Sequence, residues 1–244
     1  MPICDLGDWE GKAVRAGLDI LREGGVKILH YTHTRIAYYP NGTEQACCEC
    51  CEPLSYVESR IENATMNFPA DGIFNDNVVA NGAWSDYYGA ITSTARKKNV
   101  DTPVAFNPNC AHAHSEPCSP DCMTYGHTAH QCAHCTSDRC SNMPLSFWDL
   151  ADVHLLSEGT AGVRPPDFVT AFPYPLTDAL KSKMSMFTYN ATSSQWKGFI
   201  DDARAKGFSK FWVSEAAPGG NTTSFLSLPQ WFEEMVAYIA AMNE

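Results

Sequence analysis

The chain has 244 residues, of which 44% are hydrophobic and 11% aromatic, and its formal net charge is −11. This composition excludes a disordered chain and supplies enough apolar material for one sizeable core, so we expect a single domain over residues 1–244. The acidity argues against a nucleic-acid backbone or an anionic membrane as a partner and favours a neutral or cationic ligand. No apolar run approaches the roughly 18 residues that a membrane span needs.

Helical and strand patterns alternate along the chain. Apolar residues at helical spacing predict helices over residues 7–23, 54–68, 85–98, 195–206 and 228–243. Glycines end two of them, at Gly24-Gly25 and at Gly207. Short runs rich in β-formers predict strands over residues 26–31, 71–77, 103–107, 152–158, 183–189 and 210–214. Strands that alternate with helices imply a parallel sheet and an α/β fold.

Polar and acidic residues gather where the predicted strands end: Tyr31, His33, Asp76, Asn77, Asn107, Glu158, Ser214 and Glu215. Strand tips that converge in this way are typical of a (β/α)8 barrel, and a doubly wound sheet is the alternative. Such barrels need about 250 residues, and roughly 210 remain here once a Cys/His-rich insertion at 109–145 is set aside. We therefore expect two βα units to be missing and to precede Met1.

The cysteine content indicates an oxidising compartment. There are 11 cysteines, and Asn-x-Ser/Thr sequons begin at Asn41, Asn63, Asn190 and Asn221. Cysteine at this density is typical of disulfide-bonded secreted proteins, and sequons in such proteins are glycosylation acceptors. The first residues lack the basic and apolar regions of a signal peptide, so we expect that signal to be lost with the upstream residues.

The insertion permits two interpretations. Its cysteines and histidines are Cys110, Cys118, Cys122, Cys132, Cys135 and Cys140 with His112, His114, His127, His130 and His134. The Cys132-x-x-Cys135 pair has zinc-ligand spacing, but a second pair with fixed spacing is lacking. Three disulfides that staple a loop with few apolar residues are favoured over a metal. Cys47, Cys48, Cys50 and Cys51 form a second cluster, and we hypothesise bridges between the two clusters.

Six short motifs in order resemble the spherulin-4-like (spherulation-specific) glycoside hydrolase family. That family carries a GYV-x-T strand tip, then DGIFFDE, NPG, a strand ending in Glu, a strand ending in Thr-Asp, and a helix that opens with Leu-Pro and an aromatic pair. The corresponding pieces are His30-Tyr31-Thr32-His33-Thr34, Asp71 to Asn77, Asn107-Pro108, Ser157-Glu158, Ser214-Glu215 and Leu228-Pro229-Gln230-Trp231-Phe232.

The resemblance implies a secreted (β/α)8 barrel that cuts an α-1,4-linked, N-acetylgalactosamine-containing extracellular polysaccharide internally. It assigns catalysis to Asp76 and Glu158, because glycoside hydrolysis uses two carboxylates. We expect six residues to bind substrate: Tyr31, His33, Asn75, Asn77, Asn107 and Glu215. No cofactor and no metal are expected, since two carboxylates and water suffice, and we expect a monomer whose partner is the amino-sugar polysaccharide.

One departure from the family pattern keeps other functions open. Asn77 stands where the family has Glu, and an amide cannot transfer a proton at neutral pH. A catalytically impaired carbohydrate-binding homologue is therefore the second hypothesis, and an extracellular metal-binding protein is the third. Asp76 and Asn77 can share a site only if the strand has ended there, because adjacent strand residues face opposite ways. Asp76 as a loop cap and Glu158 as a solvated strand end are the non-functional alternatives.

Overall fold

The computed structural model describes residues 8–34, 36–38, 44–46, 52–67, 70–108, 110, 140, 143–161, 172–215 and 228–242. Within them a six-stranded sheet has the order β1-β4-β5-β6-β7-β8, and every neighbouring pair is parallel. Its strands are β1 (Leu29–His33), β4 (Gly72–Asp76), β5 (Val104–Asn107), β6 (Val153–Thr160), β7 (Met184–Tyr189) and β8 (Lys210–Val213). β2 (Ile36–Tyr38) and β3 (Glu44–Ala46) form a separate antiparallel pair.

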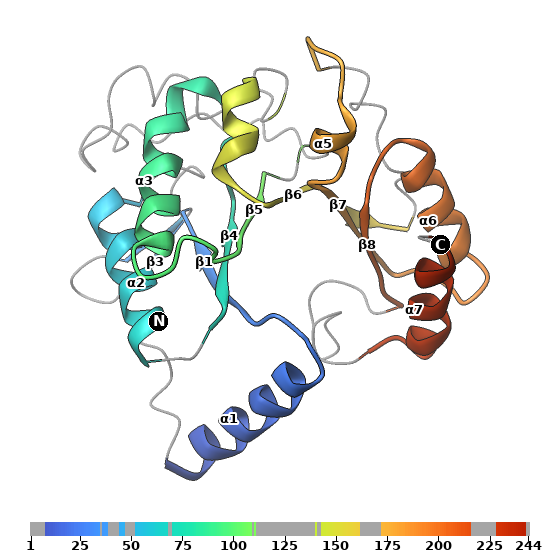
Figure 1. Ribbon diagram of the computed structural model, residues 1–244, viewed down its shortest axis with the longest axis horizontal. Helices are drawn as coiled ribbons and strands as arrows, with labels where there is room; N and C mark the ends of the chain where they lie inside the picture. The colour runs from blue at the N-terminus through green and yellow to red at the C-terminus, as the bar shows by residue number, and fades with distance from the viewer. Residues whose placement is uncertain are drawn as a thin grey trace.

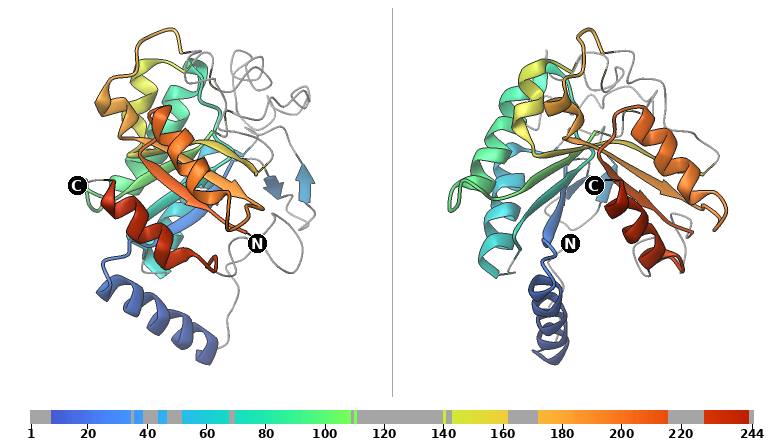
Figure 2. Two further views of the ribbon diagram at one scale, coloured as in Figure 1. Left: turned by 90° about the vertical axis from the view of Figure 1, so that its right-hand side faces the viewer. Right: turned by 45° about the vertical axis from the view of Figure 1, so that its right-hand side comes forward.

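Most of the helices lie on the outer face of the sheet, and the first precedes β1 and projects away from the sheet (Figures 1 and 2). The helices are α1 (Asp8–Glu23), α2 (Leu54–Asn67), α3 (Ser85–Arg96), α5 (Asp178–Lys181), α6 (Trp196–Ala205) and α7 (Phe232–Ala241), with 3-10 turns η1 (Gly82–Trp84) and η3 (Leu145–Leu150). In Figure 2 the sheet is curved, with α2 and α3 outside one half and α6 and α7 outside the other. The arrangement is an α/β fold compatible with part of a (β/α)8 barrel, and the two missing βα units stay a prediction.

The glycine stops predicted from the sequence are Schellman motifs. Gly207 has a φ of 93° and follows α6, and the N–H groups of Gly207 and Phe208 donate to the carbonyls of Arg204 (2.8 Å) and Ala203 (3.0 Å). Gly25 (φ 81°) ends α1 in the same way. There the Val26 N–H donates to the Leu21 carbonyl at 2.9 Å. Val26 thus closes the helix, which is why β1 begins at Leu29 and not at residue 26 as predicted.

The main core lies between the sheet and the helices outside it. Ile73 and Phe106 project from β4 and β5, are fully buried, and belong to one apolar cluster with Trp84, Tyr88 and Phe147. The Phe106 ring lies 5.5 Å from the Tyr88 ring and 6.1 Å from the Phe147 ring. Burial of these large rings fixes β4 and β5 against α3 and η3, and so fixes the strand ends that follow.

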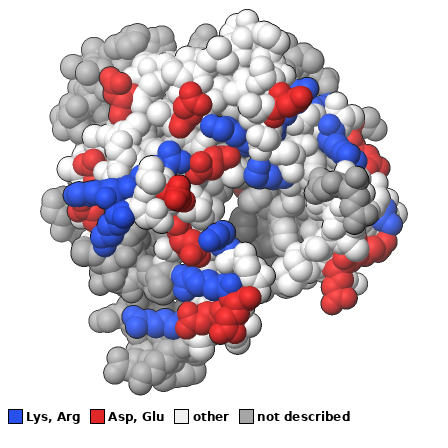
Figure 3. All heavy atoms as spheres, viewed as in Figure 1, with Lys and Arg blue, Asp and Glu red and all other residues white. Residues whose placement is uncertain are grey.

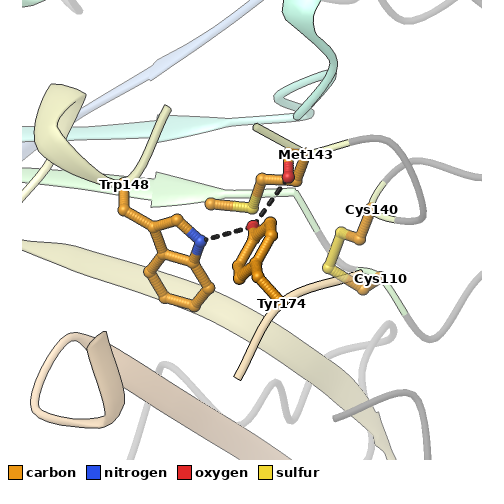
Figure 4. Close-up of a disulfide and its surroundings, with 5 residues drawn as sticks. All are labelled: Cys110, Cys140, Met143, Trp148 and Tyr174. Carbon is orange, nitrogen blue, oxygen red and sulfur yellow. Dashed lines mark hydrogen bonds between the residues drawn. A yellow bond between two sulfur atoms is a disulfide. The ribbon is translucent and has the colours of Figure 1, made fainter. Parts of the chain in front are cut away.

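One disulfide, Cys110–Cys140, joins the two ends of the insertion and is the part of the cysteine prediction that falls within the described residues (Figure 4). Next to it, the Tyr174 hydroxyl accepts from the Trp148 indole at 2.9 Å and donates to the Met143 carbonyl at 2.7 Å. These contacts hold the chain as it leaves the insertion and enters η3. The other cysteines and the histidines of the insertion lie outside the described residues.

Acidic and basic side chains are mixed over the face of the molecule in Figure 3. None of the helices that the structure describes combines the length and the apolar character needed to cross a bilayer.

Candidate active site

The carboxyl ends of β4 and β5 bring two predicted site residues together. Asp76 and Asn107 are the last residues of these strands and are direct partners in the parallel register. Because strand side chains alternate, Phe74 and Asp76 face a cavity on the inner side of the sheet, whereas Ile73 faces the helices. The cavity has a volume of about 560 Å³ and is lined by Leu29, Tyr31, Phe74, Asp76, Asn107, Glu158 and Phe187.

A β-bulge directs Glu158 into this cavity. His154 lies on the helix side of β6, where its ring is 5.0 Å from the Trp148 ring and 6.0 Å from the Phe106 ring. Strict alternation would place Glu158, four residues later, on that same side. The register between β6 and β7 shifts between Leu155 and Ser157, however, and the extra residue reverses the alternation. Glu158 therefore faces the same cavity as Asp76.

One amide group links the two carboxylates. The side-chain NH₂ of Asn107 donates to Asp76 Oδ1 at 2.8 Å and to Glu158 Oε2 at 2.6 Å. Because both oxygens are bonded to the same nitrogen, at 2.8 Å and 2.6 Å, they lie at most about 5.4 Å from each other. Asn107 is itself almost fully buried, at 3% exposure, which fixes its side chain. The three residues Asp76, Asn107 and Glu158 are called the cavity triad below.

Each carboxylate of the cavity triad also accepts a hydrogen bond from a tyrosine. The Tyr31 hydroxyl donates to Asp76 Oδ2 at 2.6 Å, and the Tyr189 hydroxyl donates to Glu158 Oε1. Burial, then the negative charge of Asp76, raises the pKa of Tyr31. Burial, then the negative charge of Glu158, raises the pKa of Tyr189. Both phenols are therefore neutral donors, and no described residue that lines the cavity carries a positive charge.

Four of the eight predicted site residues line the cavity: Tyr31, Asp76, Asn107 and Glu158. The other four lie elsewhere. His33 packs against Glu52 and Arg60, and its Nδ1 is 3.6 Å from Glu52 Oε1. Asn75 faces the helix side, fully buried, and accepts from the Thr32 hydroxyl at 2.7 Å. Glu215 accepts from the Gln230 N–H at 3.3 Å.

Asn77, the fourth of these residues, contacts Asp76 without lining the cavity. β4 ends at Asp76, and Asn77 adopts a left-handed backbone with a φ of 57°. Its backbone N–H donates to Asp76 Oδ1 at 2.9 Å and its side-chain amide to Oδ2 at 3.2 Å. Asn77 is thus a donor to the adjacent carboxylate, and its side chain is not among those that line the cavity.

The sequence interpretation missed Tyr189 and the apolar lining. Tyr189 is the last residue of β7, so the strand-tip criterion that selected Asn107 would also have selected it. Leu29, Phe74 and Phe187 sit inside strands, where an apolar residue predicts core and gives no sign of a cavity.

Among the described residues no group of three or more His, Cys, Asp or Glu side chains is arranged to hold a metal ion. The zinc interpretation concerned the insertion, which lies outside these residues except at Cys110 and Cys140.

Comparisons with known proteins add little to this geometry. No protein-family model matches the chain, and no curated protein matches it. Among solved structures the chain is similar to Aspergillus clavatus Sph3, crystallised in complex with GalNAc, at 14% identity and a TM-score of 0.48. The alignment covers 77% of this chain and 66% of that chain, just under two thirds. We draw neither fold nor activity from a likeness of this size, and membership of the spherulin-4-like family stays a prediction.

Proposed function

We propose that this protein is a glycoside hydrolase that cuts an extracellular amino-sugar polysaccharide internally, with Asp76 and Glu158 as its two reacting carboxylates. The observation that carries the proposal is the Asn107 amide, which donates to both carboxylates at the floor of an open cavity. Such a pair at the carboxyl ends of parallel strands is where an α/β sheet builds an active site.

The spacing of the pair favours a two-step reaction. Carboxyl groups about 5 Å apart suit a retaining mechanism, whereas inverting enzymes leave a wider gap for water. In the first step one carboxyl group protonates the glycosidic oxygen as the other attacks the anomeric carbon, which breaks the glycosidic bond and forms a glycosyl ester. Water, deprotonated by the first group, then cleaves the ester and restores both carboxyl groups. This chemistry needs no cofactor.

The cavity suits a sugar in its size and lining. A volume of about 560 Å³ is in the range of small-ligand sites, so it would hold one or two sugar units of a longer chain. Phe74, Phe187 and Tyr31 offer apolar ring surface to the C–H faces of a sugar. The finer assignment, an α-1,4-linked N-acetylgalactosamine polymer, rests on the motif resemblance, and secretion rests on the cysteine content together with the Cys110–Cys140 bridge.

The contacts of Asn77 favour an enzyme over the impaired homologue. The amide lies against Asp76 as a hydrogen-bond donor and does not line the cavity, so a carboxylate at position 77 is not required to complete the pair. Asparagine is also one of the few residues that readily adopts a left-handed backbone, which gives the amide a structural reason to be present.

The test is the release of oligosaccharides from a partly deacetylated α-1,4-galactosamine polymer, followed by mass spectrometry. We expect release by the full chain, and loss of release in Asp76→Asn and Glu158→Gln. Glu234→Gln is the matched control, because Glu234 pairs with Lys197 on the surface at 2.6 Å. Binding of the polymer with no release by the full chain would support the carbohydrate-binding homologue and overturn the proposal.

A further inference from the structure

Tyr189 is a buried side chain whose hydroxyl is directed at the candidate site. It ends β7, is 2% exposed, and donates its hydroxyl hydrogen to Glu158 Oε1. The other carboxylate oxygen of Glu158 accepts from Asn107 at 2.6 Å. Glu158 is thus held at both oxygens by neutral donors from β7 and β5, and a carboxylate held in this way has a fixed orientation.

Tyr31 supports Asp76 in the corresponding way from the other side of the cavity. Its hydroxyl donates to Asp76 Oδ2 at 2.6 Å, while Asp76 Oδ1 accepts from Asn107 at 2.8 Å. Tyr31 is 54% exposed, however, and its ring also stacks on Phe74 with 6.1 Å between centroids. The two carboxylates therefore both accept hydrogen bonds from the Asn107 amide, and each accepts one from a different phenol. Of these two phenols, that of Tyr189 is shielded from solvent and that of Tyr31 is not.

We propose that Tyr189 is a positioning residue for Glu158, which it holds through a hydroxyl separate from the one that Tyr31 directs at Asp76. This inference rests on the proposed function. A donated O–H stabilises the ionised form of the carboxylate that accepts it. An arginine would cancel the charge of the carboxylate, whereas a neutral phenol does not. The phenol hydroxyl can also rotate to accept a hydrogen bond once the carboxyl group is protonated.

The raised pKa of Tyr189 supports this role. Burial is its largest cause and the charge of Glu158 the next, so the phenol keeps its proton at any pH at which a glycosidase acts. The charge of Asp76 contributes in the same direction, as expected for a phenol that lies within the field of both carboxylates.

The kinetic test compares Tyr189→Phe with Tyr174→Phe. Loss of the Tyr189 hydroxyl should lower kcat about tenfold with little change in KM, because a hydrogen bond to a charged group is lost while the cavity wall is kept. The limb of the kcat/KM pH profile that Glu158 governs should move upward by about one unit, since the carboxylate becomes easier to protonate. Tyr31→Phe should move the opposite limb, and by less, because Tyr31 is exposed.

Tyr174→Phe is the matched control, because it also removes a tyrosine hydroxyl. That hydroxyl makes two hydrogen bonds, to Trp148 and Met143, away from the carboxylates (Figure 4). Its pH profile should equal that of the unaltered chain. A Tyr189→Phe profile with both limbs unmoved would overturn the proposal, as would equal displacement in Tyr174→Phe.

A second readout needs no turnover. The protein is labelled with tyrosine that carries ¹³C at Cζ, and the Tyr189 resonance is assigned by its absence from Tyr189→Phe. The chemical shift of this resonance should change in Glu158→Gln and stay the same in Glu234→Gln. An unmoved resonance in Glu158→Gln would overturn the proposal. If the full chain releases no oligosaccharide, the proposed function fails, while this measurement still decides whether Tyr189 holds Glu158.

Discussion

Two groups of acidic and polar residues near the carboxyl end of the sheet differ in what faces them. The cavity triad, Asp76, Asn107 and Glu158, borders an open space and is held by neutral donors. A second group, Glu52, Arg60 and His33, is called the sealed cluster here. Glu52 has no exposed surface, and Arg60 donates to its carboxylate and to the His33 carbonyl.

The sealed cluster fastens the chain between β1 and α2. The Glu52 N–H donates to the Thr34 carbonyl at 3.2 Å, and the Tyr87 hydroxyl donates to the Glu52 carbonyl at 2.9 Å. Burial raises the pKa of Glu52 to about 8, although Arg60 opposes it. Burial, then Arg60, lowers the pKa of His33 to about 4. A carboxyl group closed in against a cation is part of the framework, whereas one that borders an open cavity is accessible to a substrate.

The largest expected difference between the two groups is in activity. Glu158→Gln should lower kcat/KM by about 10³-fold or more, because the amide can neither attack nor transfer a proton. Glu52→Gln should leave kcat/KM within about threefold, since Glu52 has no access to the cavity. The measurement is steady-state hydrolysis with circular dichroism to confirm folding. Equal losses in the two variants would remove the distinction.

For the free energy of unfolding we expect the opposite order, with larger losses in variants of the sealed cluster than in variants of the cavity triad. Arg60→Leu leaves the buried carboxyl group of Glu52 and the His33 carbonyl without their donor, and we expect a loss of about 3 kcal/mol in the free energy of unfolding. Asn107→Leu, in the cavity triad, should cost less stability and more activity. Urea denaturation measures both. A loss below about 1 kcal/mol for Arg60→Leu would show that the sealed cluster does not fasten the chain.

The pH dependence of stability should also come from the sealed cluster. The folded pKa of Glu52, about 8, lies above the ordinary value of 4.5, so its contribution is fully present below pH 4.5 and is lost as the pH rises toward 8. We expect a fall of roughly 3.5 kcal/mol between pH 5 and 8. The fall should be absent in Glu52→Gln, as followed by denaturation at a series of pH values. A fall that persists in the variant would assign it to another group.

Asn77→Glu has a small expected effect and tests whether position 77 belongs to the cavity triad. A glutamate at a φ of 57° is strained by about 1 kcal/mol and adds a negative charge beside Asp76. Since position 77 does not line the cavity, kcat/KM should change by less than about tenfold. Hydrolysis that appears only in the variant would show instead that the natural chain is a binder.

Local patterns predicted much of the fold, and four of the eight predicted site residues line the cavity. The glycine caps at Gly25 and Gly207, the parallel order and most strand limits follow from short-range rules. Alternation separates Asn75 from Asp76 once the strand's inner face is known. The orientation of Glu158 does not follow, because the bulge after Leu155 leaves no sequence signature and strict alternation from His154 gives the wrong face.

Pairings between distant parts of the chain could not be predicted. Arg60 meets His33 across 27 residues, and Tyr189 meets Glu158 across 31. Such contacts depend on how neighbouring strands and helices pack, and neither residue pair shows a periodicity or motif of its own. The short β2–β3 pair was missed for a related reason, since three-residue strands are too short for a periodic signal.

The most direct measurement is the anomeric configuration of the first product, followed by proton NMR as the full chain cleaves an α-linked galactosamine oligomer. Two carboxylate oxygens held within about 5.4 Å by the Asn107 amide predict retention, so the α-anomer should form first and then mutarotate. Initial formation of the β-anomer, or no cleavage, would contradict the assignment of Asp76 and Glu158 as the reacting pair.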